Sequence, residues 1–250
     1  MTAGDMTVAG VVARMQQRLD DLGPDLEPRR VFLGTYLRTT SAVGKAIEGA
    51  SFEDPAWVEA WDVIFAELYL RAHDADRDGR QADVPRPWRL AFAAPTDLPP
   101  LRHVLLGINA HVNFDLPQAL LAAITDEDFA DPVILDRRRR DHERIDAVLS
   151  QRVAAEDDEL AATAGKTWSD RLLGPLNRIS SRRFLSESRR KVWHNTEQLQ
   201  HARLSGPGAY RTRLAELEVL SAARIADLLA PGPVLLRLAV AGFGVTLPPP

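Results

Sequence analysis

The chain has 250 residues, of which 45% are hydrophobic and 26% are charged, and its formal net charge is −4. This composition indicates a folded globular protein with an extensive core and excludes wholesale disorder. The chain contains no cysteine, which excludes disulfides, thiolate metal sites, iron–sulfur clusters and cysteine nucleophiles. The acidic balance disfavours nucleic acid as the main partner.

No run of about 18 apolar residues occurs in the sequence, so no segment is expected to span a membrane. Residues 1–12 lack the basic start and the apolar stretch of a signal peptide. We therefore expect a cytoplasmic protein.

Apolar residues recur at helical spacing along almost the whole chain, whereas strand-like alternation is scarce. The pattern predicts a first helix over residues 8–19 and a second helix that begins at Pro28. Asp54 is placed to cap a third helix whose first residue is Pro55. This third helix carries apolar residues at i, i+3, i+4 and i+7, which is typical of an amphipathic helix.

The middle of the chain starts with a polar loop over residues 74–87 and a short helical piece over 88–93. A long apolar stripe then predicts a helix over about 100–120. A highly charged helix follows over about 134–160. Further apolar segments are expected over residues 172–179, 184–199, 214–229 and 234–245.

Together these elements predict an all-α protein in which residues 1–250 form one irregular domain of roughly eight helices. The helix at about 100–120 is expected to be central and buried. The C-terminal helices within 207–245 are expected to pack on the rest.

The most unusual segment lies in this central helix, where four polar side chains interrupt the apolar stripe. His111 and Asp115 are one turn apart on one face, and Asn109 and Asn113 are one turn apart on a neighbouring face. Buried polar groups are costly unless each has a partner. Pro117 removes a backbone donor next to this cluster and is expected to kink the helix.

Two interpretations of this cluster remain open at the level of sequence. One is a satisfied core network in which Asp115 orients the His111 ring and the asparagines bridge helices. The other is an acid–base site made by the His111–Asp115 pair.

A metal site is a further alternative, because a second His-x-x-x-Asp pair occurs at His142 and Asp146. With His111 and Asp115, this pair could supply four ligands to zinc or another divalent cation. The two patterns resemble those of helical zinc phosphoesterases of the phospholipase C and P1-nuclease type, although the chain lacks their N-terminal tryptophan ligand. His142 also follows the run Arg137 to Arg140, which predicts a solvent-exposed position.

Residues 176–213 form a basic stretch with nine Lys and Arg and two acidic residues. This stretch would suit an anionic ligand, an acidic partner or another subunit of a homo-oligomer. Within it, Trp193 and His194 are placed to reach the site at His111 if their helix packs nearby.

Several segments together resemble a bacterial domain-of-unknown-function family over about residues 30–200. The resemblance rests on the central segment Asn109-Ala110-His111-Val112-Asn113-Phe114-Asp115-Leu116 and on pieces before it, namely Phe32, Tyr36 to Thr40, Phe52 to Trp57, Phe65, Tyr69 and Trp88 to Phe92. It implies a helical fold and no particular reaction. It also favours Tyr36, Thr40 and Tyr69 as the polar groups that face the central helix, and it weakens the metal alternative because position 142 is often apolar in that family.

Our leading hypothesis is a buried site for a small, largely apolar organic molecule. His111 would act as general acid or base and Asp115 would orient it, whereas Asn109, Asn113, Tyr36, Thr40, Tyr69 and Trp193 would bind the substrate. Such a site would permit cyclisation, isomerisation or hydrolysis without a redox cofactor. The alternatives are a zinc-type phosphoesterase and a non-catalytic binding or scaffold protein.

Overall fold

The computed structural model describes residues 6–163 and 190–230, and these residues form helices without any strand among them. The all-α fold class is therefore confirmed. The longer N-terminal helices are α1 (Val8–Asp20), α2 (Glu27–Glu48), α3 (Pro55–Arg77) and α4 (Arg86–Phe92), with short 3-10 turns at Pro24–Leu26 and Gln81–Asp83. They are followed by α5 (Pro100–Ala110), a π-helical turn (His111–Asp115), α6 (Leu116–Ala123), α7 (Asp126–Ala130), α8 (Pro132–Thr163), a helix over 190–204, and α10 (Pro207–Leu229).

Helix α3 begins where the sequence predicts. The Asp54 carboxylate accepts a hydrogen bond from the Trp57 backbone N–H at 3.1 Å, and Pro55 lies in the first turn. This cap satisfies one of the donors that a helix N-terminus leaves free.

The prediction of a loop from residue 74 is wrong at its start, because α3 continues to Arg77. Two arginines from neighbouring helices hold its acidic last turns. Arg18 of α1 pairs with Asp74 at 2.6 Å, and Arg29 of α2 pairs with Asp76 at 2.5 Å. These tertiary ion pairs extend the helix beyond the point that local polarity indicates.

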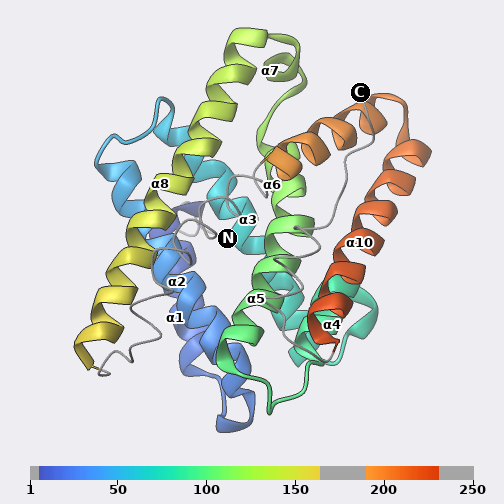
Figure 1. The fold of residues 1–250 in the computed structure, drawn as a ribbon. Coiled ribbons are helices and arrows are strands. Elements are labelled where there is room, and N and C mark those ends of the chain that lie inside the picture. Colours follow the sequence, from blue (N-terminus) through green and yellow to red (C-terminus); the bar gives the residue numbers. More distant parts are fainter. Residues whose placement is uncertain (1–5, 164–189, 231–250) are drawn as a thin grey trace.

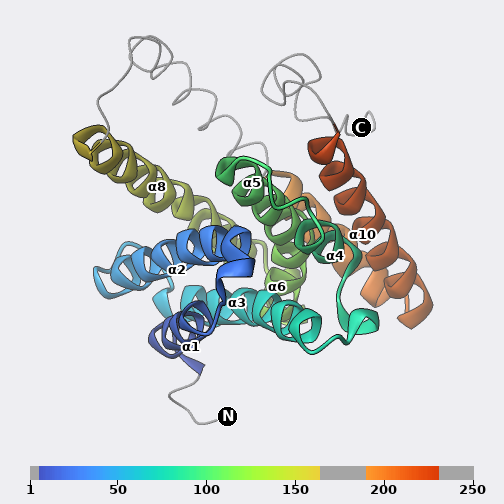
Figure 2. The same cartoon turned by 90° about the horizontal axis from the view of Figure 1, so that it is seen from below.

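Helix α5, the π-helical turn and α6 follow one another as a rod through the molecule (Figures 1 and 2). α2 and α3 pack on one side of the rod, and α4 and α10 pack on α5. The inward side chains of the rod include Leu106, Leu116 and Leu120, each at most 1% exposed. This layered arrangement places His111 and Asp115 among the core helices.

The expectation of a single α-helix over residues 100–120 is corrected by the π-helical turn at its centre. There the Leu116 N–H donates to the His111 carbonyl, five residues back. Pro117 supplies the physical reason, because it has no N–H to continue the α-helical ladder. The side-chain amide of Gln118 donates to the Phe114 carbonyl at 2.8 Å on the same turn. Such turns occur frequently at functional sites.

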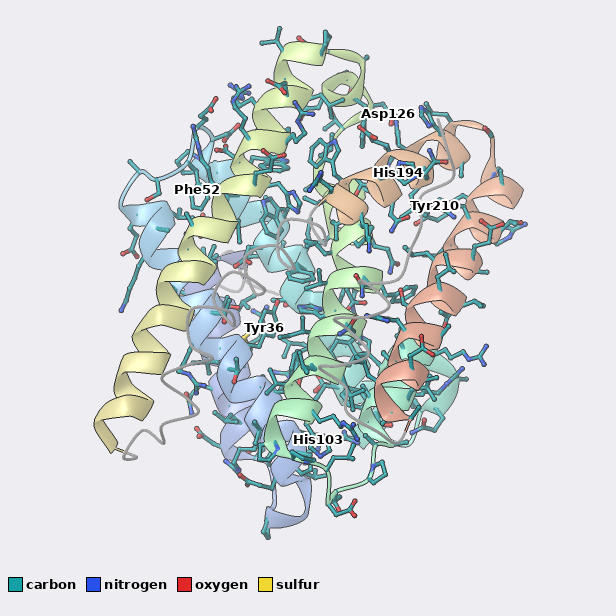
Figure 3. The ribbon with its side chains drawn as sticks, in the orientation of Figure 1. Tyr36, Phe52, His103, Asp126, His194 and Tyr210 are labelled. Carbon is teal, nitrogen blue, oxygen red and sulfur yellow. The ribbon has the colours of Figure 1, made fainter. Side chains whose placement is uncertain are left out.

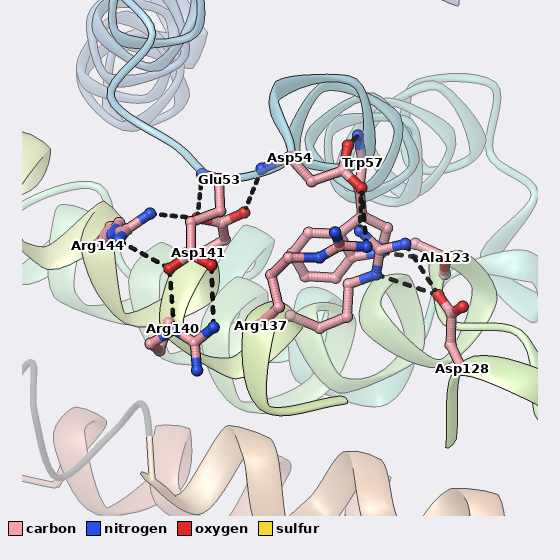
Figure 4. Close-up of polar contacts among 10 residues, drawn as sticks. Glu53, Asp54, Trp57, Ala123, Asp128, Arg137, Arg140, Asp141 and Arg144 are labelled. Carbon is pink, nitrogen blue, oxygen red and sulfur yellow. Dashed lines mark hydrogen bonds and ion pairs between the residues drawn. The ribbon is translucent and has the colours of Figure 1, made fainter. Parts of the chain in front are cut away.

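Helix α8 docks on the loop between α2 and α3 through a buried carboxylate (Figure 4). Asp141 is fully buried and accepts hydrogen bonds from the backbone N–H groups of Glu53 and Asp54, both at 2.8 Å. Arg138 pairs with Asp54 and with Asp128, and its side chain lies over the Trp57 ring. The arginine run is therefore not wholly solvent-exposed.

The C-terminal part of the prediction is covered only in part. α10 packs against α4, α5 and the π-helical turn. The segments predicted over residues 172–179 and 234–245, and the basic stretch over 176–189, lie outside the described residues. In the portion that the structure describes, no helix combines the length and hydropathy that a membrane crossing requires.

Candidate functional site

The His111–Asp115 pair forms as predicted and is almost completely buried. The two side chains are 3% and 1% exposed, and His111 Nδ1 lies 2.8 Å from Asp115 Oδ2. Trp88 of α4 donates its indole N–H to the same oxygen at 2.8 Å. The carboxylate accepts from both rings, so the hydrogen bond places the imidazole proton on Nδ1 and leaves Nε2 as an acceptor.

Burial dominates the protonation of this pair. It lowers the pKa of His111, and the nearby Asp115 opposes that change. It raises the pKa of Asp115, which the His111 and Trp88 hydrogen bonds oppose. The imidazole is therefore neutral at pH 7, in the form that can accept a proton.

Aromatic rings enclose the imidazole. Phe65 of α3 stacks on it with ring centroids 3.6 Å apart and planes 6° apart, and Tyr36 of α2 meets its edge at 4.5 Å. Phe32, Tyr69 and Trp88 complete the enclosure at 6.5, 6.0 and 5.8 Å. His111 Nε2 is buried and has no hydrogen-bond partner among the described residues.

Two predicted hydroxyls lie on α2, and one of them belongs to Tyr36, whose ring contacts the imidazole. Tyr36 and Thr40 share a face of α2 and both are buried, and apart from a weak contact between the two hydroxyls neither has a hydrogen-bond partner in the described part of the chain. Burial and the charges of Asp62 and Asp115 raise the pKa of Tyr36 well above its ordinary value. Tyr36 is therefore a neutral phenol that can donate a hydrogen bond.

The two asparagines form a separate chain of hydrogen bonds. Asn113 donates its side-chain amide to Asn109 Oδ1 at 3.0 Å, and Asn109 donates to the Leu105 carbonyl at 2.8 Å. These bonds tie the amides to their own helix, whereas the bond of His111 goes to Asp115.

Trp193 packs elsewhere, against the second predicted histidine. Its ring lies 5.7 Å from that of His142, and its indole N–H donates to Glu197 at 3.0 Å. His142 is 1% exposed, so the prediction of a solvent-exposed position is wrong. The reason is tertiary, because Trp61 of α3 and Trp193 both contact this face of α8.

The metal alternative with four ligands from the two His-x-x-x-Asp pairs stays a prediction, because only three of those side chains lie within the described residues. No group of three or more histidine or acidic side chains there is arranged to hold a metal ion. The side chain of Asp146 lies outside the described residues.

A small pocket of about 50 Å³ opens on the surface beside His111 and the aromatic rings that enclose it, which we call the histidine cluster. Its lining comprises Leu26, Pro28, Arg29, Phe32, Tyr69, Trp88, Ala91, Phe92, Ala94, Thr96, His103 and Gly107. Phe32, Tyr69 and Trp88 belong to both features, so these rings form a wall between the pocket and His111. The sequence-based hypothesis placed a cavity directly at the imidazole, whereas this pocket lies behind the wall.

Three important residues were not selected from the sequence. Trp88 was noted only in the family resemblance, although a buried indole N–H needs an acceptor and Asp115 provides it. Arg29 and His103 line the pocket, but they lie 74 positions apart and carry no local pattern. Only the packing of α2 against α5 brings them together.

Comparison of the chain with curated proteins and with solved structures found no match. The sequence does match a family defined only as a domain of unknown function, over residues 8–231. This match includes the histidine cluster and the pocket, and it extends beyond the 30–200 range of the resemblance seen in the sequence. The chain therefore belongs to the family of unknown function DUF5995.

Proposed function

We propose that this protein binds a small, largely apolar organic molecule beside His111 and uses the His111–Asp115 pair for acid–base chemistry on it. Asp115 would hold the imidazole in one tautomer, and His111 Nε2 would remove or return a proton. This chemistry suits a cyclisation, an isomerisation or a hydrolysis, and it requires no redox cofactor.

The observation that supports this proposal best is the buried, unpartnered Nε2 of His111. A buried polar atom without a partner costs about 1–3 kcal/mol, and such atoms are uncommon in stable cores. The hydroxyls of Tyr36 and Thr40 lie on α2 and interact weakly with each other, and neither has a further partner among the described residues. A ligand hydroxyl beside the imidazole would donate to Nε2, and its oxygen could accept from the Tyr36 hydroxyl.

The stacked rings suit an apolar ligand body and indicate how it would reach the imidazole. Phe32, Tyr69 and Trp88 separate His111 from the pocket, so a ligand that enters through the pocket must displace one of these packed side chains to reach the imidazole. Side-chain rotamer changes are common at binding interfaces.

Phenol tests the proposal, because it combines an apolar ring with a hydroxyl that can donate to Nε2. We would label the six histidines with ¹⁵N, assign the His111 signals from a His111→Gln variant, and titrate the full chain with phenol. Phenol is expected to shift the Nε2 signal of His111, whereas benzene, which lacks the hydroxyl, should not.

The proposal also predicts that His111→Ala abolishes turnover but preserves the helical circular dichroism. A variant that unfolds, together with a His111 signal that phenol at saturating concentration does not shift, would show that the pair is only structural.

A further inference from the structure

The surface pocket has a distinct polar character that the His111 hypothesis does not use. Three of its lining residues, Arg29, Tyr69 and His103, each carry a buried polar atom without a hydrogen-bond partner among the described residues. These atoms are Arg29 Nη1, the Tyr69 hydroxyl and His103 Nε2. They come from α2, α3 and α5, so three separate helices contribute residues with unsatisfied polar atoms to the lining of one small pocket (His103 is labelled in Figure 3).

All three groups can donate a hydrogen bond. The guanidinium of Arg29 is donor-only, the Tyr69 hydroxyl can donate, and a neutral imidazole donates when its proton is on Nε2. Burial raises the pKa of Tyr69, so this phenol keeps its proton, and the Arg29 charge opposes that rise. The pocket therefore offers donors to an acceptor atom.

The position of Arg29 is well defined. Its Nη2 pairs with Asp76 at 2.5 Å, and its guanidinium lies over the Phe92 ring, 4.4 Å from the centroid. These two contacts hold the side chain at the wall of the pocket and leave Nη1 without a partner. A fixed donor of this kind loses little conformational entropy when it binds a ligand.

The charges around the pocket favour a neutral acceptor. Asp76 already neutralises Arg29. Asp97 lies near enough to His103 to oppose the lowering of its pKa by burial. A carboxylate ligand would meet both acids, whereas a carbonyl group would meet only the donors.

The size of the pocket limits what it encloses. One buried water needs about 10–15 Å³ of cavity volume. A cavity of 50 Å³ therefore holds a chemical group of about four non-hydrogen atoms. Apart from Thr96, the remaining surface of the pocket is apolar and includes Leu26, Pro28, Ala91, Phe92 and Ala94. A ligand can therefore place its polar head inside and rest an apolar body on the rim.

We propose that the pocket lined by α2, α3, α4 and α5 binds small organic molecules with an apolar body and a neutral carbonyl head, through Arg29, Tyr69 and His103. This inference goes beyond the proposed function, because it does not require His111 to be catalytic.

The test uses three aromatic probes on the full chain with ¹⁵N-labelled histidines. Acetophenone carries the carbonyl head, α-methylstyrene replaces its oxygen with a CH₂ group, and benzoate carries the negative charge. Acetophenone is expected to shift the His103 signals and to bind at least tenfold more tightly than either of the other probes. Equal binding of acetophenone and α-methylstyrene, tighter binding of benzoate, or no response at His103 would overturn the proposal.

Variants identify the groups responsible. Tyr69→Phe removes only an unpartnered hydroxyl, so it should fold normally and weaken acetophenone binding several-fold without affecting α-methylstyrene. Arg29→Met should weaken acetophenone binding at least tenfold. Arg38→Met changes an exposed residue on the same helix and should leave acetophenone binding unchanged. Wild-type affinity in the Tyr69→Phe variant would contradict the role of the donors even if Arg29→Met did not fold.

The two proposals fail independently. A response at His103 without one at His111 would support the pocket and count against the acid–base site. A response at His111 alone would do the reverse.

Discussion

Gly107 provides a sharp test of the packing that holds the histidine cluster together. It lies on α5 against the ring of Phe32, and a Cβ at this position would approach three ring atoms at 2.2, 2.5 and 2.7 Å. Phe32 cannot move easily, because its ring contacts those of Tyr36, Tyr69 and Trp88. Gly107→Ala should therefore strain the wall between the pocket and His111.

The magnitude follows from two opposing effects. Overpacking a core by one methyl group typically costs about 1–3 kcal/mol. Replacing glycine by alanine within a helix returns about 1 kcal/mol. The contacts of Gly107 lie far below normal van der Waals separation and involve a confined ring, so we expect the upper part of the range. The net change is then a loss of about 1–2 kcal/mol in the free energy of unfolding.

Gly34 offers the matched control, since it is also a buried helical glycine. A Cβ at Gly34 would meet only the Arg38 side chain, at 3.5 Å, which is ordinary contact. Gly34→Ala should therefore stabilise the protein by about 0.5–1 kcal/mol. Urea unfolding of the full chain, followed by circular dichroism at 222 nm, compares the two variants.

The essential result is that Gly107→Ala lowers the free energy of unfolding whereas Gly34→Ala raises it. If Gly107→Ala were as stable as Gly34→Ala, Phe32 would not be confined, and the wall would be loosely packed. In a double variant, Phe32→Leu should remove most of the penalty of Gly107→Ala, because the shorter side chain makes room for the methyl group.

Two further predictions concern buried ionisable groups. Asp141→Asn should lower the free energy of unfolding by about 1–3 kcal/mol, since an amide cannot accept from two backbone N–H groups through both of its side-chain atoms. The exposed Asp20→Asn control should change it by less than about 0.5 kcal/mol, and equal effects in urea unfolding would refute the role of Asp141. Burial lowers the pKa values of His103 and His111 in the folded protein. As the pH falls toward about 6.5 and below, the unfolded chain therefore binds more protons than the folded chain, and the free energy of unfolding should decrease from pH 7.5 to 5.5. Asp115 opposes this trend because its pKa is raised, but a His103→Gln variant should still show a smaller decrease, and a stability that rises toward pH 5.5 would contradict this reasoning.

Many of the helices could be predicted from residues that are close together in the sequence. Asp54 and Pro55 mark the start of α3 because a capping carboxylate and an N-terminal proline act within one turn. The contact between His111 and Asp115 could also be predicted, because residues four apart share a helix face. These features depend on spacings of a few residues.

Other parts of the site depended on contacts between helices. The burial of His142 could not be predicted from the arginine run beside it, because Trp61 and Trp193 come from distant segments. The hydrogen bond from Trp88 to Asp115 likewise joins residues 27 positions apart.

The sequence by itself determined that this protein is helical, where several of its helices begin, and that His111 and Asp115 would share a helix face. Only the tertiary structure decided that aromatic rings from three helices enclose that histidine, and that the pocket lies beyond them with Arg29 and His103 in its lining. The physical reason is that helical periodicity and capping act over one or two turns. Which faces meet depends instead on the packing of side chains that are far apart along the chain.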